Sequence, residues 1–303
     1  MRALLLDLDD TLLDYSGGAE QCWTEACAAV ARSVEQTRLV ATLAEARRWF
    51  WSDPARHRRE RTNMLRAWTR IAARALEDCG CPDADLAAAI AADFAVRRRR
   101  TMALFPEARA CLEMLRGRGL PLGLVTNGDA REQRWKIERC DLARFFDAIV
   151  IEGELGAGKP DAVVYETALH ALGVPAGPDV WMVGDHLDFD VAGAQHVGLR
   201  GVWVDRAGLG LPAESPVRPD QIVRALDEVL GVIEARPGGA GARRASWGWG
   251  HFGAPHDANH SREAPRRRRG ATNVWGVGGH FGAPMLTKAT RSGRSRSGAA
   301  ASP

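Results

Sequence analysis

The chain has 303 residues, of which 46% are hydrophobic and 26% charged, a composition typical of a soluble globular protein with a sizeable core. The formal net charge of +3 conceals an asymmetry, because residues 236–303 hold 12 Lys and Arg against 2 Asp and Glu, which leaves 29 against 36 in residues 1–235. No apolar run approaches the roughly 18 residues of a membrane span or forms a secretory leader near Arg2, so we expect a cytoplasmic protein with reduced cysteines and no membrane partner.

The chain begins with a short apolar run, Ala3–Leu6, which predicts a buried strand. Three carboxylates follow, at Asp7, Asp9 and Asp10. Buried carboxylates need partners or they take up a proton, whereas the ends of parallel strands are where open α/β sheets bind ligands. Because residues i and i+2 of a strand share a face, we predict that Asp7 and Asp9 share a metal ion and that Asp10 points away. The alternative is an acidic turn without chemistry.

Residues 16–100 are rich in Ala, Arg, Glu and Leu and poor in Gly and Pro. This composition predicts helices over about residues 18–33, 37–52, 57–79 and 84–100. We expect the aromatic side chains of this segment to fill the core of a helical bundle, and the alternative is that some of them line a substrate pocket.

From residue 102 onward, apolar strand patterns alternate with helical ones. The expected helices are 107–118, 130–139, 161–172 and 219–234, and the expected strands are 120–125, 145–151, 180–183 and 201–204. This alternation predicts an α/β fold with a Rossmann-like, mostly parallel sheet, into which the helical segment is inserted after the first strand. We expect a core of residues 1–14 and 102–235, an all-helical cap of residues 15–101 and a tail of residues 236–303.

The tail has a different composition, with 13 Gly, the run Arg266–Arg269, and a motif at Trp247–Pro255 that nearly repeats at Trp275–Pro284. This composition predicts a disordered segment, because it offers little apolar surface to bury. Basic residues interleaved with Trp and Phe can bind RNA through charge and stacking. A nucleic-acid-binding protein is therefore an alternative function, although we favour a tail without a function.

Polar side chains follow the ends of the predicted strands, and in chain order they are Asp7, Asp9, Thr126, Asn127, Lys159, Asp185 and Asp190. Because the carboxyl ends of parallel strands lie along one edge of a sheet, we expect these side chains to converge there. A set of carboxylate oxygens suits Mg²⁺ rather than zinc. Lysine and threonine can donate hydrogen bonds to phosphoryl oxygens. The sequence therefore predicts a site for Mg²⁺ and a phosphorylated ligand.

A second motif points to a different class of protein. Residues 153–159 match the pattern G-x-x-x-x-G-K of nucleotide-binding P-loops. The next position of a P-loop must be Ser or Thr to reach the metal, and here it is Pro160, which has neither a hydroxyl nor a backbone donor. We therefore set the nucleoside-triphosphatase interpretation aside.

The ordered set of strand-end motifs resembles the signatures of the haloacid dehalogenase-like hydrolases over about residues 1–235. The first signature is Asp7-x-Asp9-x-Thr11, the second Thr126, the third Lys159, and the fourth Gly184-Asp185 followed by Asp190. The inserted helices are similar to the helical cap of that family.

The resemblance implies that Asp7 attacks phosphorus and becomes a phospho-aspartate. It implies that Asp9 protonates the leaving alcohol and later activates water. Family members that expel halide need no such proton and usually lack an acid at this position, so Asp9 favours a phosphatase, with a phosphomutase as the alternative. General acid catalysis of this kind contributes roughly 10²–10⁴ in rate.

The resemblance also implies how the ligands are held. Mg²⁺ is expected to bind Asp7, Asp185 and the main-chain carbonyl of Asp9, with Asp190 in support. The residues expected to bind the substrate phosphate are Thr126, Asn127 and Lys159. The expected substrate is a small phosphorylated metabolite such as a sugar phosphate, a nucleotide or flavin mononucleotide.

Overall fold

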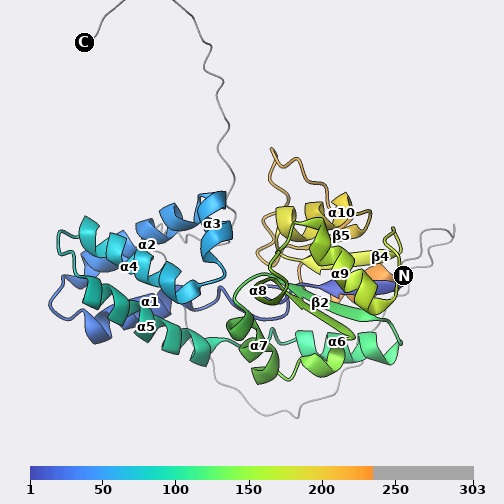
Figure 1. Ribbon diagram of the computed structural model, residues 1–303, viewed down its shortest axis with the longest axis horizontal. Coiled ribbons are helices and arrows are strands. Elements are labelled where there is room, and N and C mark those ends of the chain that lie inside the picture. The colour runs from blue at the N-terminus through green and yellow to red at the C-terminus, as the bar shows by residue number, and fades with distance from the viewer. Residues whose placement is uncertain (235–303) are drawn as a thin grey trace, which may run out of the picture.

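A computed structural model describes residues 1–234, which form a parallel sheet beside a separate group of helices (Figure 1). The six strands of this part of the chain are arranged in the order β3-β2-β1-β4-β5-β6. Their bounds are β1 Ala3–Leu6, β2 Leu122–Thr126, β3 Ala148–Ile151, β4 Val180–Gly184, β5 Arg200–Val204 and β6 Gln221–Val223. The expected fold class, a Rossmann-like parallel sheet with an inserted helical segment, is confirmed. The disorder predicted for residues 236–303 lies outside the described residues.

Strand β1 occupies the middle of the sheet, where Leu4 is paired with Leu122 of β2 on one side and Trp181 of β4 on the other. Alternate side chains of β1 enter different hydrophobic clusters, with Leu4 in one and Leu5 in the other. Both faces of the strand are therefore buried, which explains why its sequence is a continuous apolar run instead of an alternation of apolar and polar residues.

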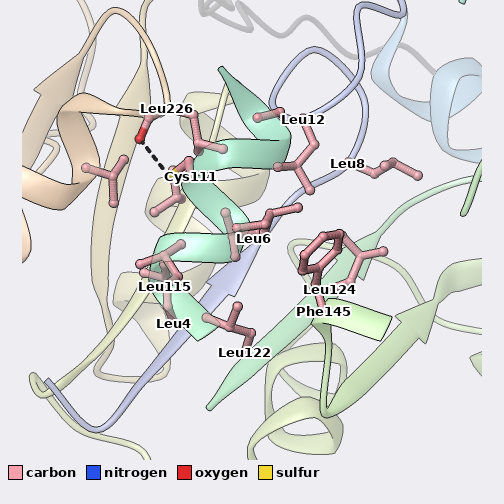
Figure 2. Packing of buried hydrophobic residues seen from close by; sticks show 14 of the residues in the cluster. Leu4, Leu6, Leu8, Leu12, Cys111, Leu115, Leu122, Leu124, Phe145 and Leu226 are labelled. Carbon is pink, nitrogen blue, oxygen red and sulfur yellow. Dashed lines mark hydrogen bonds between the residues drawn. The ribbon is translucent and has the colours of Figure 1, made fainter. Parts of the chain in front are cut away.

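Helices cover both faces of the sheet. They are α6 Ala108–Gly117, α7 Ala130–Arg139, α8 Glu152–Leu155, α9 Ala162–Leu172, α10 Gly193–His196, α11 Glu228–Glu234 and the short turns η1 Ala143–Phe145 and η2 Leu187–Ala192. Figure 2 shows Cys111 and Leu115 of α6 packed against Leu4 and Leu6. The Cys111 thiol donates to the carbonyl oxygen of Leu226 at 3.4 Å. Residues of α9 pack against the opposite face.

The inserted segment consists of α1 Ala19–Val30, α2 Gln36–Trp51, α3 Pro54–Glu60, α4 Met64–Asp78 and α5 Ala84–Thr101. These helices have a hydrophobic core of their own, in which Trp23 and Phe94 stack with ring centroids 3.8 Å apart. The predicted boundaries of the core and the cap remain predictions. Within residues 1–234, no helix combines the length and the apolar character needed to cross a bilayer.

Two of the expected helices are wrong in detail. The helix expected over 57–79 is divided into α3 and α4, because Asn63 starts a new helix by accepting a hydrogen bond from the Arg66 amide at 3.1 Å. The helix expected over 219–234 is shorter, and its first part is strand β6, which pairs in parallel with β5. A strand of three residues is too short for its alternation to be recognised in the sequence.

Candidate active site

Asp7 is the first residue after β1, and its side chain is buried at the carboxyl end of the sheet. The Thr11 hydroxyl donates to one carboxylate oxygen at 3.3 Å, and Lys159 Nζ lies 2.5 Å from the other. Asp10 adopts a φ of 58°, a left-handed conformation that aspartate tolerates better than most residues. The carboxylate of Asp10 accepts from the Ser16 amide at 2.7 Å, so this residue shapes the loop that leads to α1.

Lys159 is the centre of the group, because its ammonium contacts Asp7 at 2.5 Å and Asp190 at 2.6 Å. Asn127, which follows β2, fixes the main chain of Lys159 from both sides. Its side-chain oxygen accepts from the Lys159 amide at 2.7 Å, and its side-chain nitrogen donates to the Lys159 carbonyl at 3.0 Å. The side chain of Asn127, predicted to bind phosphate, therefore contacts the main chain of Lys159.

Asp190 reaches Lys159 from η2, a π-helical turn that follows β4. Turns of this kind occur frequently at functional sites. The amide of His186 donates to one carboxylate oxygen of Asp190 at 2.9 Å and helps to fix this side chain. A Cβ atom on Gly184 would lie only 2.2 Å from the Asp190 carboxyl carbon, so the approach of Asp190 requires glycine at the end of β4.

Carboxylates outnumber cations in this group. One oxygen each of Asp7, Asp185 and Asp190 lies within 4.8 Å of the others, and Lys159 is the ammonium that contacts two of these three acids. Burial raises the pKa of Asp7 to about 7 against the opposing pull of Lys159, and Asp190 adds to the rise. Burial and the charge of Asp7 likewise hold the pKa of Asp185 well above its ordinary value.

The pKa of Lys159 also reflects the excess of carboxylates over ammonium groups. Burial lowers it, but Asp190 and Asp7 together raise the pKa of the ammonium above its ordinary value. Three clustered carboxylates against one ammonium leave two negative charges in excess if all are ionised. A buried group of this composition is stabilised by a bound divalent cation, and its all-oxygen donors are the type that Mg²⁺ prefers.

The side chain of Asp9 does not join that of Asp7 and instead contacts helix α7. Its carboxylate contacts Lys136 Nζ at 2.8 and 2.9 Å and Gln133 Nε2 at 3.0 Å, both on α7. The same Gln133 nitrogen donates to the hydroxyl of Thr126 at 2.6 Å. The side chain of Asp9 is thus outside the carboxylate group around Lys159, and any contribution of Asp9 to a metal site falls to its main-chain carbonyl.

The inserted helices reach the site at the end of α3. Arg61 and Glu152 form a buried ion pair, with Nη2 and Oε1 2.8 Å apart. The second oxygen of Glu152 accepts from the Gly128 amide at 2.9 Å, next to the end of β2. In addition, the ring of His57 stacks on that of Phe189 in η2 at a centroid distance of 5.7 Å. The residues beside the carboxylate group are therefore partly supplied by the insertion.

Four of these residues were not predicted from the sequence: Arg61, Gln133, Lys136 and Glu152. Helix α7 is polar around most of its surface, so its pattern does not indicate that two of its polar side chains face inward. The other two pair across a separation of 91 residues, which no local pattern encodes. The one available signal was the position of α7 directly after a strand end.

Comparison with known proteins gives a consistent result. The family model described as haloacid dehalogenase-like hydrolase matches residues 1–198. A phosphoserine phosphatase of Thermus thermophilus is 38% identical over 250 residues, covering 76% of this chain and 98% of that phosphatase. A glyceraldehyde 3-phosphate phosphatase of Methanopyrus kandleri is 31% identical, covering 68% and 84%. The crystal structure of a 2-haloacid dehalogenase from Pseudomonas syringae aligns with a TM-score of 0.53 at 31% identity, covering 77% and 99%.

Proposed function

The chain belongs to the haloacid dehalogenase-like hydrolase family, and we propose that it is a phosphatase acting on phosphomonoesters of small metabolites. The observation that carries this proposal is the convergence of Asp7, Asp185 and Asp190 on Lys159 at one end of the sheet. Two of the similar proteins are phosphatases of small phosphorylated compounds, a phosphoserine phosphatase and a glyceraldehyde 3-phosphate phosphatase.

The donor set supports Mg²⁺ as the cofactor. Asp7 and Asp185 would hold the ion together with the main-chain carbonyl of Asp9, and Asp190 would support the site while it holds Lys159. When bound, the cation supplies positive charge that offsets the charge on the phosphoryl oxygens. It would also stabilise the ionised forms of Asp7 and Asp185, whose pKa values burial raises.

The proposed reaction has two steps that use side chains of this chain. In the first, an Asp7 oxygen forms a bond to phosphorus while the bond from phosphorus to the alcohol oxygen breaks, and Asp9 donates a proton to that oxygen. In the second, the oxygen of a water molecule forms a bond to phosphorus while Asp9 takes a proton from that water. The bond from phosphorus to the Asp7 oxygen breaks, which releases orthophosphate and restores the Asp7 carboxylate. Thr126 and Lys159 donate hydrogen bonds to the phosphoryl oxygens in both steps.

A competing activity is suggested by the similar 2-haloacid dehalogenase structure. Halide is expelled without a proton, so a dehalogenase has no use for an acid beside its nucleophile. Here Asp9 provides a carboxyl two residues after Asp7, and its side chain is 24% exposed, so it is accessible to a leaving alcohol. This observation favours the phosphatase.

The test is phosphate release from p-nitrophenyl phosphate by the purified full chain. Wild-type protein should be active with Mg²⁺, lose activity with a chelator and regain it when Mg²⁺ is restored. Asp7→Asn should abolish turnover. Asp10→Asn, which changes a neighbouring carboxylate that holds the loop, is the matched control and should keep most of the activity. Wild-type turnover in Asp7→Asn, or halide release from a 2-haloacid without phosphatase activity, would contradict the proposal.

A further inference from the structure

We propose that Lys136 and Gln133 of α7 are positioning residues for Asp9, which they fix relative to Asp7 and Thr126. The inference rests on the proposed function, because it concerns the group assigned there to proton transfer. Neither residue belongs to the strand-end motifs that define the site in the sequence.

The carboxylate of Asp9 is held by two side chains of α7 through three contacts. Lys136 Nζ contacts both carboxylate oxygens of Asp9, and Gln133 Nε2 donates to one of them. Residues 133 and 136 are three apart on a helix and so lie on one face. That helix begins at Ala130, where the Asp129 side chain caps it by accepting from the Glu132 amide at 3.0 Å. The two donors are thus fixed on a rigid element.

Burial makes a packing role a poor explanation for these residues. The side chain of Lys136 is 3% exposed, and such an ammonium is costly to bury unless a counter-ion compensates it. Asp9 is the carboxylate paired with it, and the ring of Tyr15 lies 4.1 Å from its nitrogen. Gln133 is also buried and connects Asp9 to Thr126 through one nitrogen. Lys136 and Gln133 therefore link the position of Asp9 to that of Thr126, which is proposed to donate a hydrogen bond to the substrate phosphate.

A positioning role has a consequence that a purely structural role lacks. Proton donation to the leaving oxygen matters most for a poor leaving group such as an alkoxide, and least for p-nitrophenolate, which departs without much help. A displaced Asp9 should therefore slow the cleavage of alkyl phosphates more than that of aryl phosphates. A general loss of folded protein would reduce both activities by the same factor.

The experiment compares kcat/KM for glycerol phosphate and p-nitrophenyl phosphate, because this ratio reports the steps up to departure of the leaving group. Lys136→Met should lower the value for glycerol phosphate by about 10²-fold and that for p-nitrophenyl phosphate by less than about 10-fold. Lys136→Arg should restore part of the difference. Arg134→Met, on the exposed side of the same helix, is the matched control and should leave both values unchanged.

Equal losses on the two esters, or no loss on either, would overturn the inference. If Lys136→Met does not fold, Gln133→Leu provides the same comparison without leaving a buried charge, and the same outcomes decide it. A different result would contradict the proposed function, namely phosphatase activity that is retained by the Asp7→Asn variant. An inactive Asp7→Asn combined with equal losses on both esters would remove only the positioning role.

Discussion

Replacement of Arg61 by methionine should strongly destabilise the protein. The Arg61 and Glu152 side chains are 7% and 8% exposed, and the guanidinium donates to Glu152 Oε1 through Nε at 2.9 Å and Nη2 at 2.8 Å. Methionine keeps much of the packing volume but leaves the Glu152 carboxylate buried without its cation. Breaking a buried pair in this way typically costs about 3–5 kcal/mol.

The structure places the expected cost at the lower end of that range. Glu152 retains the hydrogen bond from the Gly128 amide at 2.9 Å after the substitution, and Nη1 of Arg61 has no hydrogen-bond partner in the described part of the chain to lose. We therefore expect the free energy of unfolding to fall by about 3 kcal/mol. The double variant Arg61→Met with Glu152→Gln should recover a large part of this loss, because glutamine still accepts from Gly128 and carries no charge.

The assay is urea unfolding followed by tryptophan fluorescence and by far-ultraviolet circular dichroism. Arg134 and Glu154 provide the matched control, since they form a similar two-bond pair at 2.6 and 2.7 Å but are 42% and 37% exposed. Arg134→Met should cost less than about 1 kcal/mol. An Arg61→Met variant that loses no more stability than Arg134→Met, or a double variant less stable than the single one, would contradict this prediction.

Two further predictions concern pH and packing. Burial, reinforced by Arg61 and His186, lowers the pKa of His57 to about 4 from 6.5, so the unfolded chain binds a proton between these values that the folded chain excludes. The contribution of His57 to stability should fall as pH decreases from about 6.5 to 4, by at most about 3 kcal/mol, whereas the raised pKa values of Asp7 and Asp185 act in the opposite direction. The stability of the wild type relative to His57→Gln should therefore fall over this range in urea titrations. Gly153→Ala should lower the melting temperature, because its Cβ would lie 2.4 Å from the Ala130 amide nitrogen, whereas Gly177→Ala, with open space around it, should not.

The grouping of Asp7, Asp185 and Asp190 near Lys159 follows from one rule, although the Asp9 side chain, expected in the same group, turns to α7. Parallel strands with right-handed crossovers have their carboxyl ends on one edge, and a short apolar run followed by Asp7 marks such an end. The parallel arrangement of the strands then brings Lys159 and Asp190 to the same edge of the sheet as Asp7. No comparable rule tells which side of a polar helix faces inward, so Gln133 and Lys136 could not be assigned from the sequence.

The remaining differences have similar local causes. A helical composition extends across residues 57–79, and the interruption depends on the side chain of Asn63 capping the following turn. Strand β6 depends on its pairing with β5 and on the Asp205 amide, which donates to the Val223 carbonyl at 2.8 Å. Both features arise from contacts that composition and periodicity do not contain.

The central position of β1 has a consequence for how the chain is made. Leu4 is synthesised well before its partners in the sheet, Leu122 and Trp181. The inserted helices depend on contacts among themselves and can form while synthesis continues. In contrast, strand β1, which Asp7 follows, has one edge without its partner until residues 180–184 of β4 have been synthesised. A nascent chain interrupted before that point contains Asp7 but lacks β4, so the sheet beside this carboxylate is incomplete.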